Sequence, residues 1–238
     1  MKVEVWTDIM CPYCYIGKLH YEKALQQFEH ADEIELEWKA FQLNPELPDK
    51  GNGCPVREYL VNNVGYPEEG IDSMFANLKK LADDAGVPFN LPQSVAANTR
   101  DAHRLIKLAA TKGLDSAVLG KLGKAYFEEA KDYSDWGLLV SIGTEAGLEE
   151  EEIRRMLESD DYVYEIKQDM QEAANLGFDT VPTFLMDERQ AIIGSEPVDL
   201  FVKVLNKAYD AWKNRAEKEK VLEVSKGKSC NADGTCEI

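Results

Sequence analysis

The chain has 238 residues, 44% of them hydrophobic, and a formal net charge of -17 at pH 7, so it suffices for one large domain or a domain with an insertion. Such an acidic surface repels phosphate groups, which argues against nucleic acid and anionic lipid as partners. No apolar stretch approaches the roughly 20 residues that span a bilayer, and the first residues lack the apolar run of a signal peptide, so we expect no membrane partner and a cytoplasmic location.

The N-terminal part of the chain predicts a strand, a helix and a second strand. Residues 2–7 alternate in the manner of a short strand. A helical pattern follows over about residues 12–30, with a proline at its first position. Residues 33–40 alternate apolar with charged side chains, which is the clearest strand pattern in the sequence. Cys11 and Cys14 therefore fall at the junction between the first strand and the first helix.

The middle of the chain predicts helices only. A loop rich in Pro, Gly and Asn comes first, and apolar side chains then recur at helical spacing over residues 71–174 without an intervening strand pattern. We expect Cys54 to start a helix and to have no catalytic task. Arg104 is expected to form a salt bridge or to cap a helix.

The C-terminal part predicts a hairpin and one more helix. Residues 184–186 and 191–193 are short apolar segments joined by a polar turn. A helix with an apolar inner face follows and is expected to end near Trp212. The two ends of the chain together predict one discontinuous α/β domain.

We place that domain at residues 1–42 and 176–212. Residues 43–175 are predicted to form a large all-helical insertion domain, and residues 213–238 a C-terminal tail that carries a second cysteine pair. The residue pattern gives no indication of an oligomeric state.

The segment Cys11-Pro12-Tyr13-Cys14 has the chemistry that disulfide exchange needs, a thiolate nucleophile and a second thiol that resolves the mixed disulfide. Cys11 is expected at a helix N-terminus, where backbone N–H groups and the helix dipole favour negative charge. Cys14 lies one turn later on the apolar face. We therefore predict that Cys11 attacks and Cys14 resolves. Pro12 and Tyr13 are expected to contact substrate, with Tyr13 either shaping access or covering Cys11.

The remaining cysteine pair, Cys230 and Cys236, flanks an Asp-Gly turn that can bring the two thiols together. The pair is a second redox pair that exchanges electrons with Cys11 and Cys14, a local clamp, or a metal site; we favour the redox pair. Zinc held by all four cysteines is the alternative to the redox interpretation. Because a strand–helix junction suits redox chemistry better, we predict no bound metal.

Segments 8–14, 98–105, 181–184 and 194–195 resemble the DsbA-like thioredoxin superfamily and, within it, the FrnE-like branch. The resemblance implies a thioredoxin-like fold with a large helical insertion, and oxidoreductase or isomerase activity on protein or small-molecule thiols and disulfides. Related 2-hydroxychromene-2-carboxylate isomerases and kappa-class glutathione transferases commonly have serine at the position of Cys11. A glutathione-dependent transferase or isomerase is therefore the alternative enzyme, and a non-catalytic metal-binding or chaperone-like protein is a third hypothesis.

The resemblance also implies roles for residues outside the cysteine motif. Pro182 is expected to form a cis peptide bond opposite the cysteine pair, so that the backbone of Val181 pairs with an extended substrate. Ser195 and Glu196 align with the segment that holds the glutamyl end of glutathione. Glutathione is thus a candidate cosubstrate, and we expect no bound cofactor. His103 either faces the substrate from the insertion or is an ordinary buried histidine.

Overall fold

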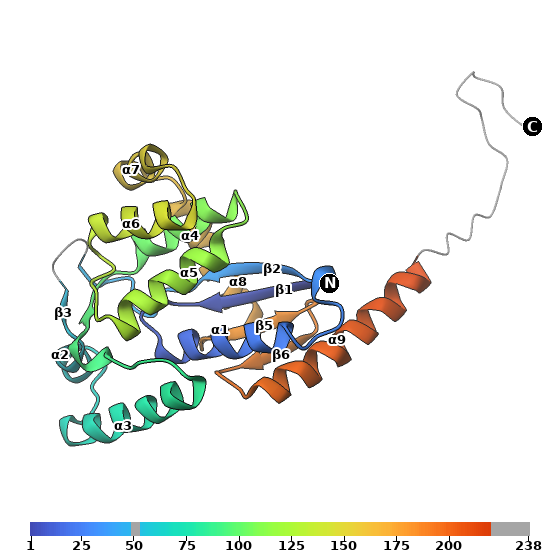
Figure 1. Cartoon of the computed structure of the whole chain (residues 1–238), viewed down its shortest axis with the longest axis horizontal. Helices are drawn as coiled ribbons and strands as arrows, with labels where there is room; N and C mark the ends of the chain where they lie inside the picture. The colour runs from blue at the N-terminus through green and yellow to red at the C-terminus, as the bar shows by residue number, and fades with distance from the viewer. Residues whose placement is uncertain (49–52, 220–238) are drawn as a thin grey trace, which may run out of the picture.

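Strands from the two ends of the chain form one central sheet (Figure 1). Strand β1 (Lys2–Thr7) lies between β2 (Glu35–Ala40), its parallel neighbour, and β5 (Thr183–Met186), its antiparallel neighbour. Strand β6 (Gln190–Ile193) pairs with β5 and completes the order β2-β1-β5-β6. The α/β fold with a helical segment inserted between the two halves of the sheet is therefore confirmed.

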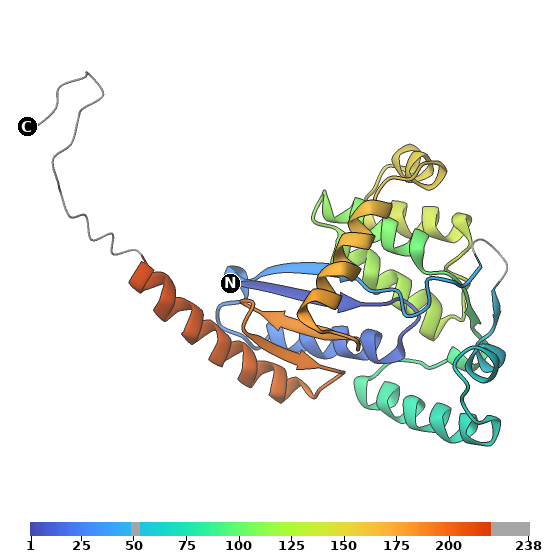
Figure 2. The same ribbon diagram turned by 180° about the vertical axis from the view of Figure 1, so that it is seen from behind.

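Helices cover both faces of this sheet in the computed structural model, which describes residues 1–48 and 53–219. Helices α1 (Pro12–Leu25) and α9 (Val198–Glu219) pack against each other on one face (Figure 1). Helix α8 (Val163–Leu176) lies beside β2 on the opposite face (Figure 2). The result is a three-layer arrangement with the sheet buried in the middle.

Aromatic side chains fill the layer between the sheet and its first helix. The ring centroid of Tyr21 on α1 lies 5.3 Å from that of Phe184 on β5 and 5.8 Å from that of Phe201 on α9. All three side chains are fully buried. The Tyr21–Phe201 contact is edge-to-face and the Tyr21–Phe184 contact is tilted. These ring contacts add to the burial of apolar area, so this cluster holds α1 in place on the sheet.

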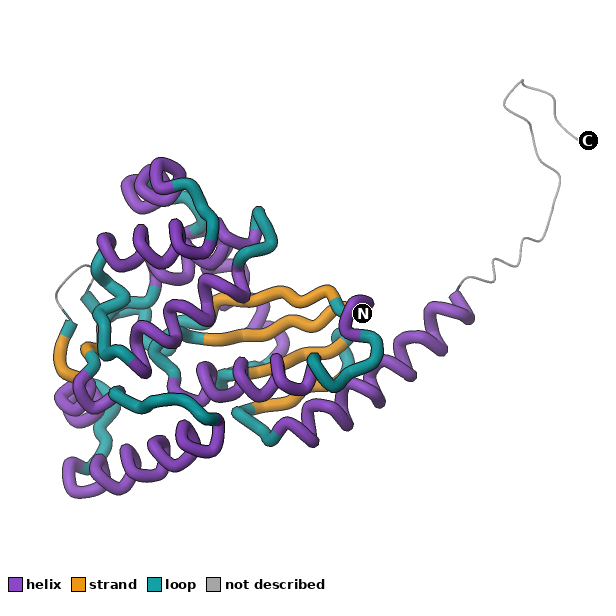
Figure 3. The backbone as a smooth tube through the Cα atoms, in the orientation of Figure 1, coloured by secondary structure: helices purple, strands orange, loops and turns teal. Residues whose placement is uncertain are grey.

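The remaining helices gather at the end of the sheet where β1 finishes (Figure 3). They are α2 (Val56–Asn62), α3 (Glu68–Ala85), α4 (Arg100–Ala110), α5 (Asp115–Gly123), α6 (Trp136–Ala146) and α7 (Glu150–Glu158), with a π-helical turn η3 (Lys124–Glu128) after α5. Helices α3, α6 and α8 each end at a glycine with positive φ, as helices commonly do. No helix within the described residues is long and apolar enough to cross a membrane.

Two short strands correct the expectation of a purely helical insertion. Strand β3 (Cys54–Pro55) pairs with β4 (Val95–Ala96) in a separate antiparallel sheet. The expectation that Cys54 starts a helix is wrong, because Cys54 lies in β3 and Pro55 is the residue that precedes α2. Two-residue strands are too short for an alternating pattern to show in the sequence.

The ends of two helices also differ from expectation. Helix α1 ends at Leu25, because tight turns carry the chain out of the helix and bury Phe28 against Tyr209. Helix α9 continues past Trp212 and includes Glu219, the last residue that the structure describes. There Lys213 contacts the hydroxyl of Tyr209 at 3.2 Å and the carboxylate of Glu33 at 3.0 Å, and no helix breaker follows.

A buried ion cluster ties α8 to the sheet. The carboxylate of Asp169 accepts the backbone N–H of Ala40 at 2.7 Å and lies 2.5 Å from the ammonium of Lys107. Its backbone carbonyl accepts the indole N–H of Trp6 at 2.9 Å. The ammonium of Lys39 lies 3.9 Å from the same carboxylate. One residue of α8 thus contacts β1, β2 and α4.

Candidate active site

Cys11 occupies the position directly before α1. Its backbone is extended, and its sulfur accepts the N–H of Cys14 at 3.3 Å, so the side chain caps the helix. Pro12 fills the first helical position, where no N–H is required. An N–H donor and the positive end of a helix both favour negative charge on this sulfur.

Cys14 lies one turn further along, in a different environment. Its sulfur accepts the backbone N–H of Asp8 at 3.5 Å. Burial raises the pKa of the Cys14 thiol well above its ordinary value, the hydrogen bond and charge of Cys11 raise it further, and hydrogen bonds with Thr7 and Asp8 oppose the shift. Cys14 is therefore a thiol at neutral pH. Neither Cys11, Cys14 nor Cys54 forms a disulfide in this structure.

Val181 and Pro182 stand across from the first cysteine. The bond between them is cis, and the carbonyl oxygen of Val181 lies 3.7 Å from the sulfur of Cys11. Helix α1 approaches this loop closely, since a Cβ at Gly17 would lie 3.1 Å from the ring of Pro182. Glycine is therefore the residue that lets the cysteine-bearing helix and the Pro182 loop pack together.

A cavity of about 390 Å³ opens beside Cys11. Apolar side chains of α2 and α3, among them Tyr59 and Leu78, line it opposite the cysteine. Its lining includes three large apolar residues that are well exposed, namely Tyr13 at 44%, Leu43 at 46% and Val64 at 54%. Cys14 does not line this cavity, so Cys11 is the sulfur that an incoming molecule meets.

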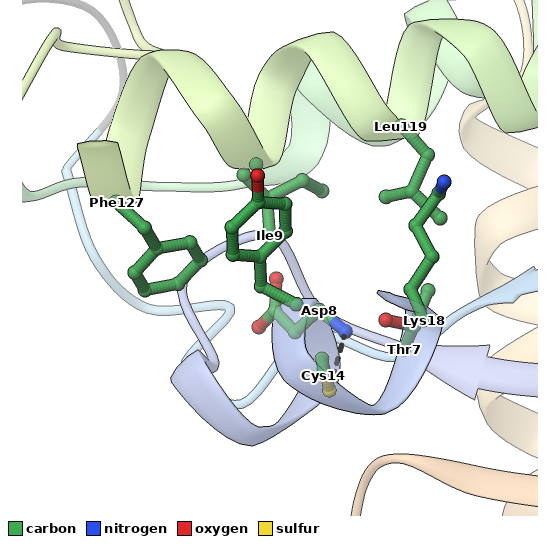
Figure 4. A pocket seen from close by; sticks show the side chains of 9 residues that line it. Thr7, Asp8, Ile9, Cys14, Lys18, Leu119 and Phe127 are labelled. Atoms are coloured by element: carbon green, nitrogen blue, oxygen red, sulfur yellow. Dashed lines mark hydrogen bonds between the residues drawn. The ribbon is translucent and has the colours of Figure 1, made fainter. Parts of the chain in front are cut away.

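A second, water-sized space lies behind Cys14. It measures about 10 Å³ and is lined by Cys14, Asp8, Thr7 and Lys18 among others. Figure 4 shows this site, with the dashed line marking the bond between the backbone of Asp8 and the sulfur of Cys14. The two sulfurs thus face different spaces, one wide and apolar, the other small and polar on one side.

Asp8 is a further candidate site residue. It lies in segment 8–14, but no role was predicted for its side chain. Its carboxylate is fully buried and accepts the backbone N–H of Leu43 at 2.7 Å. Its second oxygen lies 3.3 Å from Nε2 of His103, whose side chain is 2% exposed. The sequence feature that could have predicted it is its position, since this acidic residue directly follows a buried strand and lies three positions before Cys11.

The other predicted site residues lie elsewhere. His103 packs against Asp8 and does not line the cavity beside Cys11. Ser195 and Glu196 lie between β6 and α9, where the carbonyl of Glu196 is 2.8 Å from Nδ1 of His20, and neither lines that cavity. Cys230 and Cys236 lie outside the described residues.

The role expected for Arg104 is confirmed. Its guanidinium lies 2.9 Å from the carboxylate of Asp101 and binds the carbonyls of Ser159 and Asp161 at 2.5 and 2.7 Å, where α7 has ended. Within residues 1–48 and 53–219, no group of three or more Cys, His, Asp or Glu side chains is placed to hold a metal ion.

Comparison with known proteins gives one family over most of the chain. Residues 2–206 match the family described as the DSBA-like thioredoxin domain. The structure of a probable DsbA oxidoreductase from Streptomyces coelicolor is 32% identical, with a TM-score of 0.83 over 100% of this chain and 99% of that chain.

Two further structures share the fold. A 2-hydroxychromene-2-carboxylate isomerase is 15% identical, with a TM-score of 0.65 over 91% of this chain and 98% of that chain. The cytosolic disulfide reductase DsbM from Pseudomonas aeruginosa, solved with GSH, is 15% identical, with a TM-score of 0.63 over 88% of this chain and 100% of that chain.

Proposed function

The chain belongs to the DSBA-like thioredoxin family of thiol oxidoreductases, and we propose on that basis that it exchanges disulfides with its substrates through Cys11 and Cys14. The observation that carries the proposal is the asymmetry of the two sulfurs. Both cysteines are buried, but Cys11 accepts an N–H at the start of α1 and lines the large cavity, whereas Cys14 lines the small space behind it and has a raised pKa. Nucleophile and resolving thiol need these opposite properties.

The proposed reaction has two steps in the reducing direction. The Cys11 thiolate attacks one sulfur of a substrate disulfide, forms a mixed disulfide and releases the other substrate sulfur as a thiolate. Cys14 then loses its proton and attacks the sulfur of Cys11, which releases the second substrate thiolate and leaves a Cys11–Cys14 disulfide. Two electrons pass from the enzyme dithiol to the substrate. Oxidation of a substrate dithiol is the reverse, and the reduction potentials of the two pairs set the direction.

We further propose that the substrate carries an apolar group next to its reacting sulfur. The cavity beside Cys11 has the size of a small-molecule or side-chain site and a lining that is almost entirely apolar. The backbone carbonyl of Val181 lies beside the Cys11 sulfur, where the backbone of an extended peptide bound at Cys11 would pass, so a cysteine flanked by apolar residues in an unfolded protein fits both features. A small aromatic disulfide fits the cavity alone.

Glutathione remains a proposal as cosubstrate. DsbM, which shares the fold, was solved with GSH, and this motivates the test. The net charge of -17 disfavours an anionic ligand at long range. Conjugation of glutathione to an aryl halide would identify the transferase alternative. A cytoplasmic location stays a prediction from the sequence.

Catalysed reduction of insulin by dithiothreitol tests the proposed function. We expect the wild-type chain to shorten the time to insulin precipitation, and Cys11→Ser to return it to the uncatalysed time. Cys54→Ser is the matched control, because Cys54 is a half-buried cysteine in β3 that lines neither space at the motif, and it should behave as wild type. Full activity in Cys11→Ser would overturn the proposal.

A further inference from the structure

A π-helical turn joins helix α1 to the inner wall of the cavity beside Cys11. We propose that Tyr126, in the middle of this turn η3, is the specificity-determining residue of the cavity, and that Tyr15 on α1 is the positioning residue that holds it there. The ring of Tyr126 favours substrates that carry an aromatic group next to the reacting sulfur. This inference rests on the proposed function and names the substrate group that the same site prefers.

The turn is wider than an α-helix and is held by donors from another segment. The carbonyl of Lys124 accepts the N–H of Glu129 at 3.2 Å, five positions further on, as in a π-helix. The carbonyl of Tyr126 accepts the hydroxyl of Ser94 at 2.8 Å, and the next carbonyl accepts the backbone N–H of Asn90 at 2.6 Å. These donors satisfy the backbone of the wide turn, so its conformation is a stable part of the fold.

Consecutive residues of η3 line the two spaces at the cysteine motif. Tyr126 lines the large cavity beside Cys11, whereas Phe127 lines the small space behind Cys14. Figure 4 shows Phe127 extending from its helical segment toward α1. The turn therefore borders the surroundings of both sulfurs, and a shift of η3 would move the cavity wall relative to Cys11.

Tyr15, the residue after Cys14, fixes η3 to α1. Its hydroxyl donates to the carboxylate of Glu128 at 2.6 Å, and its ring stacks on that of Phe127 with the centroids 5.3 Å apart. A Cβ at Gly123, directly before the turn, would clash with the Tyr15 ring, so glycine permits this contact. Burial, and then the hydrogen bond to Glu128, raises the pKa of Tyr15, so its phenol stays a donor at neutral pH.

The ring of Tyr126 is held from its other side by Tyr133. The two ring centroids lie 4.8 Å apart in an edge-to-face arrangement, and the hydroxyl of Tyr133 binds both the N–H and the carbonyl of Ala97, at 3.0 and 2.7 Å. Tyr126 is 1% exposed, unlike the well-exposed residues at the cavity rim. A bound group therefore meets this ring at the inner wall as a preorganised surface.

Other side chains of the cavity also favour an aromatic occupant. Two further rings, Tyr13 and Tyr59, and two thioethers, Met10 and Met74, belong to its lining. Aromatic rings gain from edge-to-face and offset packing on other rings, and methionine sulfur contacts ring edges favourably. An aliphatic ring of similar size buries a similar apolar area but gains neither contact. A sulfur next to an aromatic ring therefore fits this cavity best.

Two probes of similar size test the preference. Phenylethyl and cyclohexylethyl 2-pyridyl disulfide share one leaving group and differ in whether the six-membered ring is aromatic. The full-length chain with Cys54→Ser, Cys230→Ser and Cys236→Ser is reduced and mixed with each probe in a stopped-flow instrument. The Cys11 thiolate attacks the sulfur next to the ethyl group and forms a mixed disulfide. The bond to the other sulfur breaks with its electron pair on pyridine-2-thiolate, which takes a proton from solvent and is measured as the thione.

The ratio of the two rate constants, phenylethyl over cyclohexylethyl, cancels changes in the reactivity of Cys11. We expect this ratio to be about threefold or more above that of free 2-mercaptoethanol, because a ring pair adds to the burial of apolar area. Tyr126→Leu should reduce it to the value of the free thiol, whereas Tyr126→Phe keeps the ring and should keep the ratio.

Tyr15→Phe removes only the hydroxyl that binds Glu128, and we expect it to lose half or more of the preference. Tyr209→Phe is the matched control. The hydroxyl of Tyr209 also donates to a glutamate, Glu33, at 2.6 Å, and neither of these two residues lines the cavity. This variant should keep the ratio of the parent chain.

An unchanged ratio in Tyr126→Leu, or a parent ratio no higher than that of 2-mercaptoethanol, overturns the inference. If Tyr126→Leu does not fold, as judged by circular dichroism, Tyr15→Phe decides, and a ratio equal to that of Tyr209→Phe overturns it. Thione release no faster than in Cys11→Ser would overturn the proposed function, and this inference with it. Rapid release with an unchanged ratio overturns only the role of Tyr126.

Discussion

The sulfur of Cys11 lies 3.7 Å from the carbonyl oxygen of Val181, although 170 positions separate the two residues in the chain. Pairing of β1 with β5, in which Trp6 stands opposite Thr183, brings them together. The nucleophile therefore comes from the first half of the sheet and the neighbouring carbonyl edge from the second half. The insertion between the halves supplies the apolar cavity, so each part of the chain contributes one component of the site.

The fluorescence of Trp6 should report the redox state of the cysteine pair. Its indole is fully buried in one apolar cluster with Cys11 and Cys14. We expect the emission of the chain to differ between the reduced and oxidised forms and Trp6→Phe to lose that difference. Trp38→Phe is the control, since Trp38 is equally buried but belongs to the larger core cluster and donates to Ser116. A full redox response in Trp6→Phe would contradict this prediction.

A charge on the cavity rim should weaken substrate binding without changing the chemical step. Val64 lines the cavity beside Cys11 and is 54% exposed, so Val64→Asp should fold normally. For an aromatic disulfide we expect KM to rise about tenfold with kcat nearly unchanged, because only binding of the apolar group is lost. Steady-state kinetics measure both values. Tyr164→Asp, at an exposed site on α8, should leave them as in wild type, and equal effects of the two variants would count against the cavity.

Loss of the Asp169 carboxylate should destabilise the fold strongly. It accepts the N–H of Ala40 and pairs with Lys107, both in buried or nearly buried surroundings. Removing one partner of a buried ion pair costs about 3–5 kcal/mol, so Asp169→Ala should lower the free energy of unfolding by that order. Urea denaturation followed by circular dichroism measures it. Asp83→Ala removes an exposed pair with Lys79 and should change little; similar losses in both would refute the assignment.

The buried hydroxyl of Tyr21 should make the stability of the wild-type chain fall with rising pH more steeply than that of Tyr21→Phe. Its buried hydroxyl has no hydrogen-bond partner within the described residues, and burial raises its pKa. Above about pH 10 the unfolded chain ionises this phenol while the folded chain does not, so stability falls as pH rises. At neutral pH the free energy of unfolding of Tyr21→Phe should lie within about 1 kcal/mol of the wild-type value. At higher pH the variant should be more stable than wild type. Parallel pH profiles for the two proteins would contradict this.

Local patterns explain which parts of the fold were predictable. The alternation over β2 has a period of two residues, and the final hairpin consists of two short apolar segments joined by a polar turn; both are patterns of neighbouring residues. Cys11 and Cys14 form a local motif, and their spacing of three positions predicts that they share one turn of a helix. The match to the DSBA-like thioredoxin family extends from residue 2 to residue 206, so the resemblance seen in short segments holds across the fold.

Contacts between distant segments explain the rest. His103 meets Asp8 across 95 positions of chain, and no local pattern marks that pairing. The apolar stripe that begins at residue 71 identifies a face of α3, but only the packed structure shows that α2 and α3 leave a cavity beside Cys11. The contact between Lys213 on α9 and Glu33 also joins elements from opposite ends of the chain, and no local pattern marks it.

The most direct test of the account is to trap the first intermediate. Cys14→Ser removes the resolving thiol but keeps Cys11 at the start of α1. Combined with Cys230→Ser and Cys236→Ser, which remove the tail thiols that could resolve the adduct instead, it should stop the reaction with a disulfide substrate at the mixed disulfide. Intact-protein mass spectrometry and peptide mapping should then show one substrate thiol bound, on Cys11. An adduct on Cys54 instead, or no stable adduct under conditions where the wild-type chain is oxidised, would contradict the assignment of the two sulfurs.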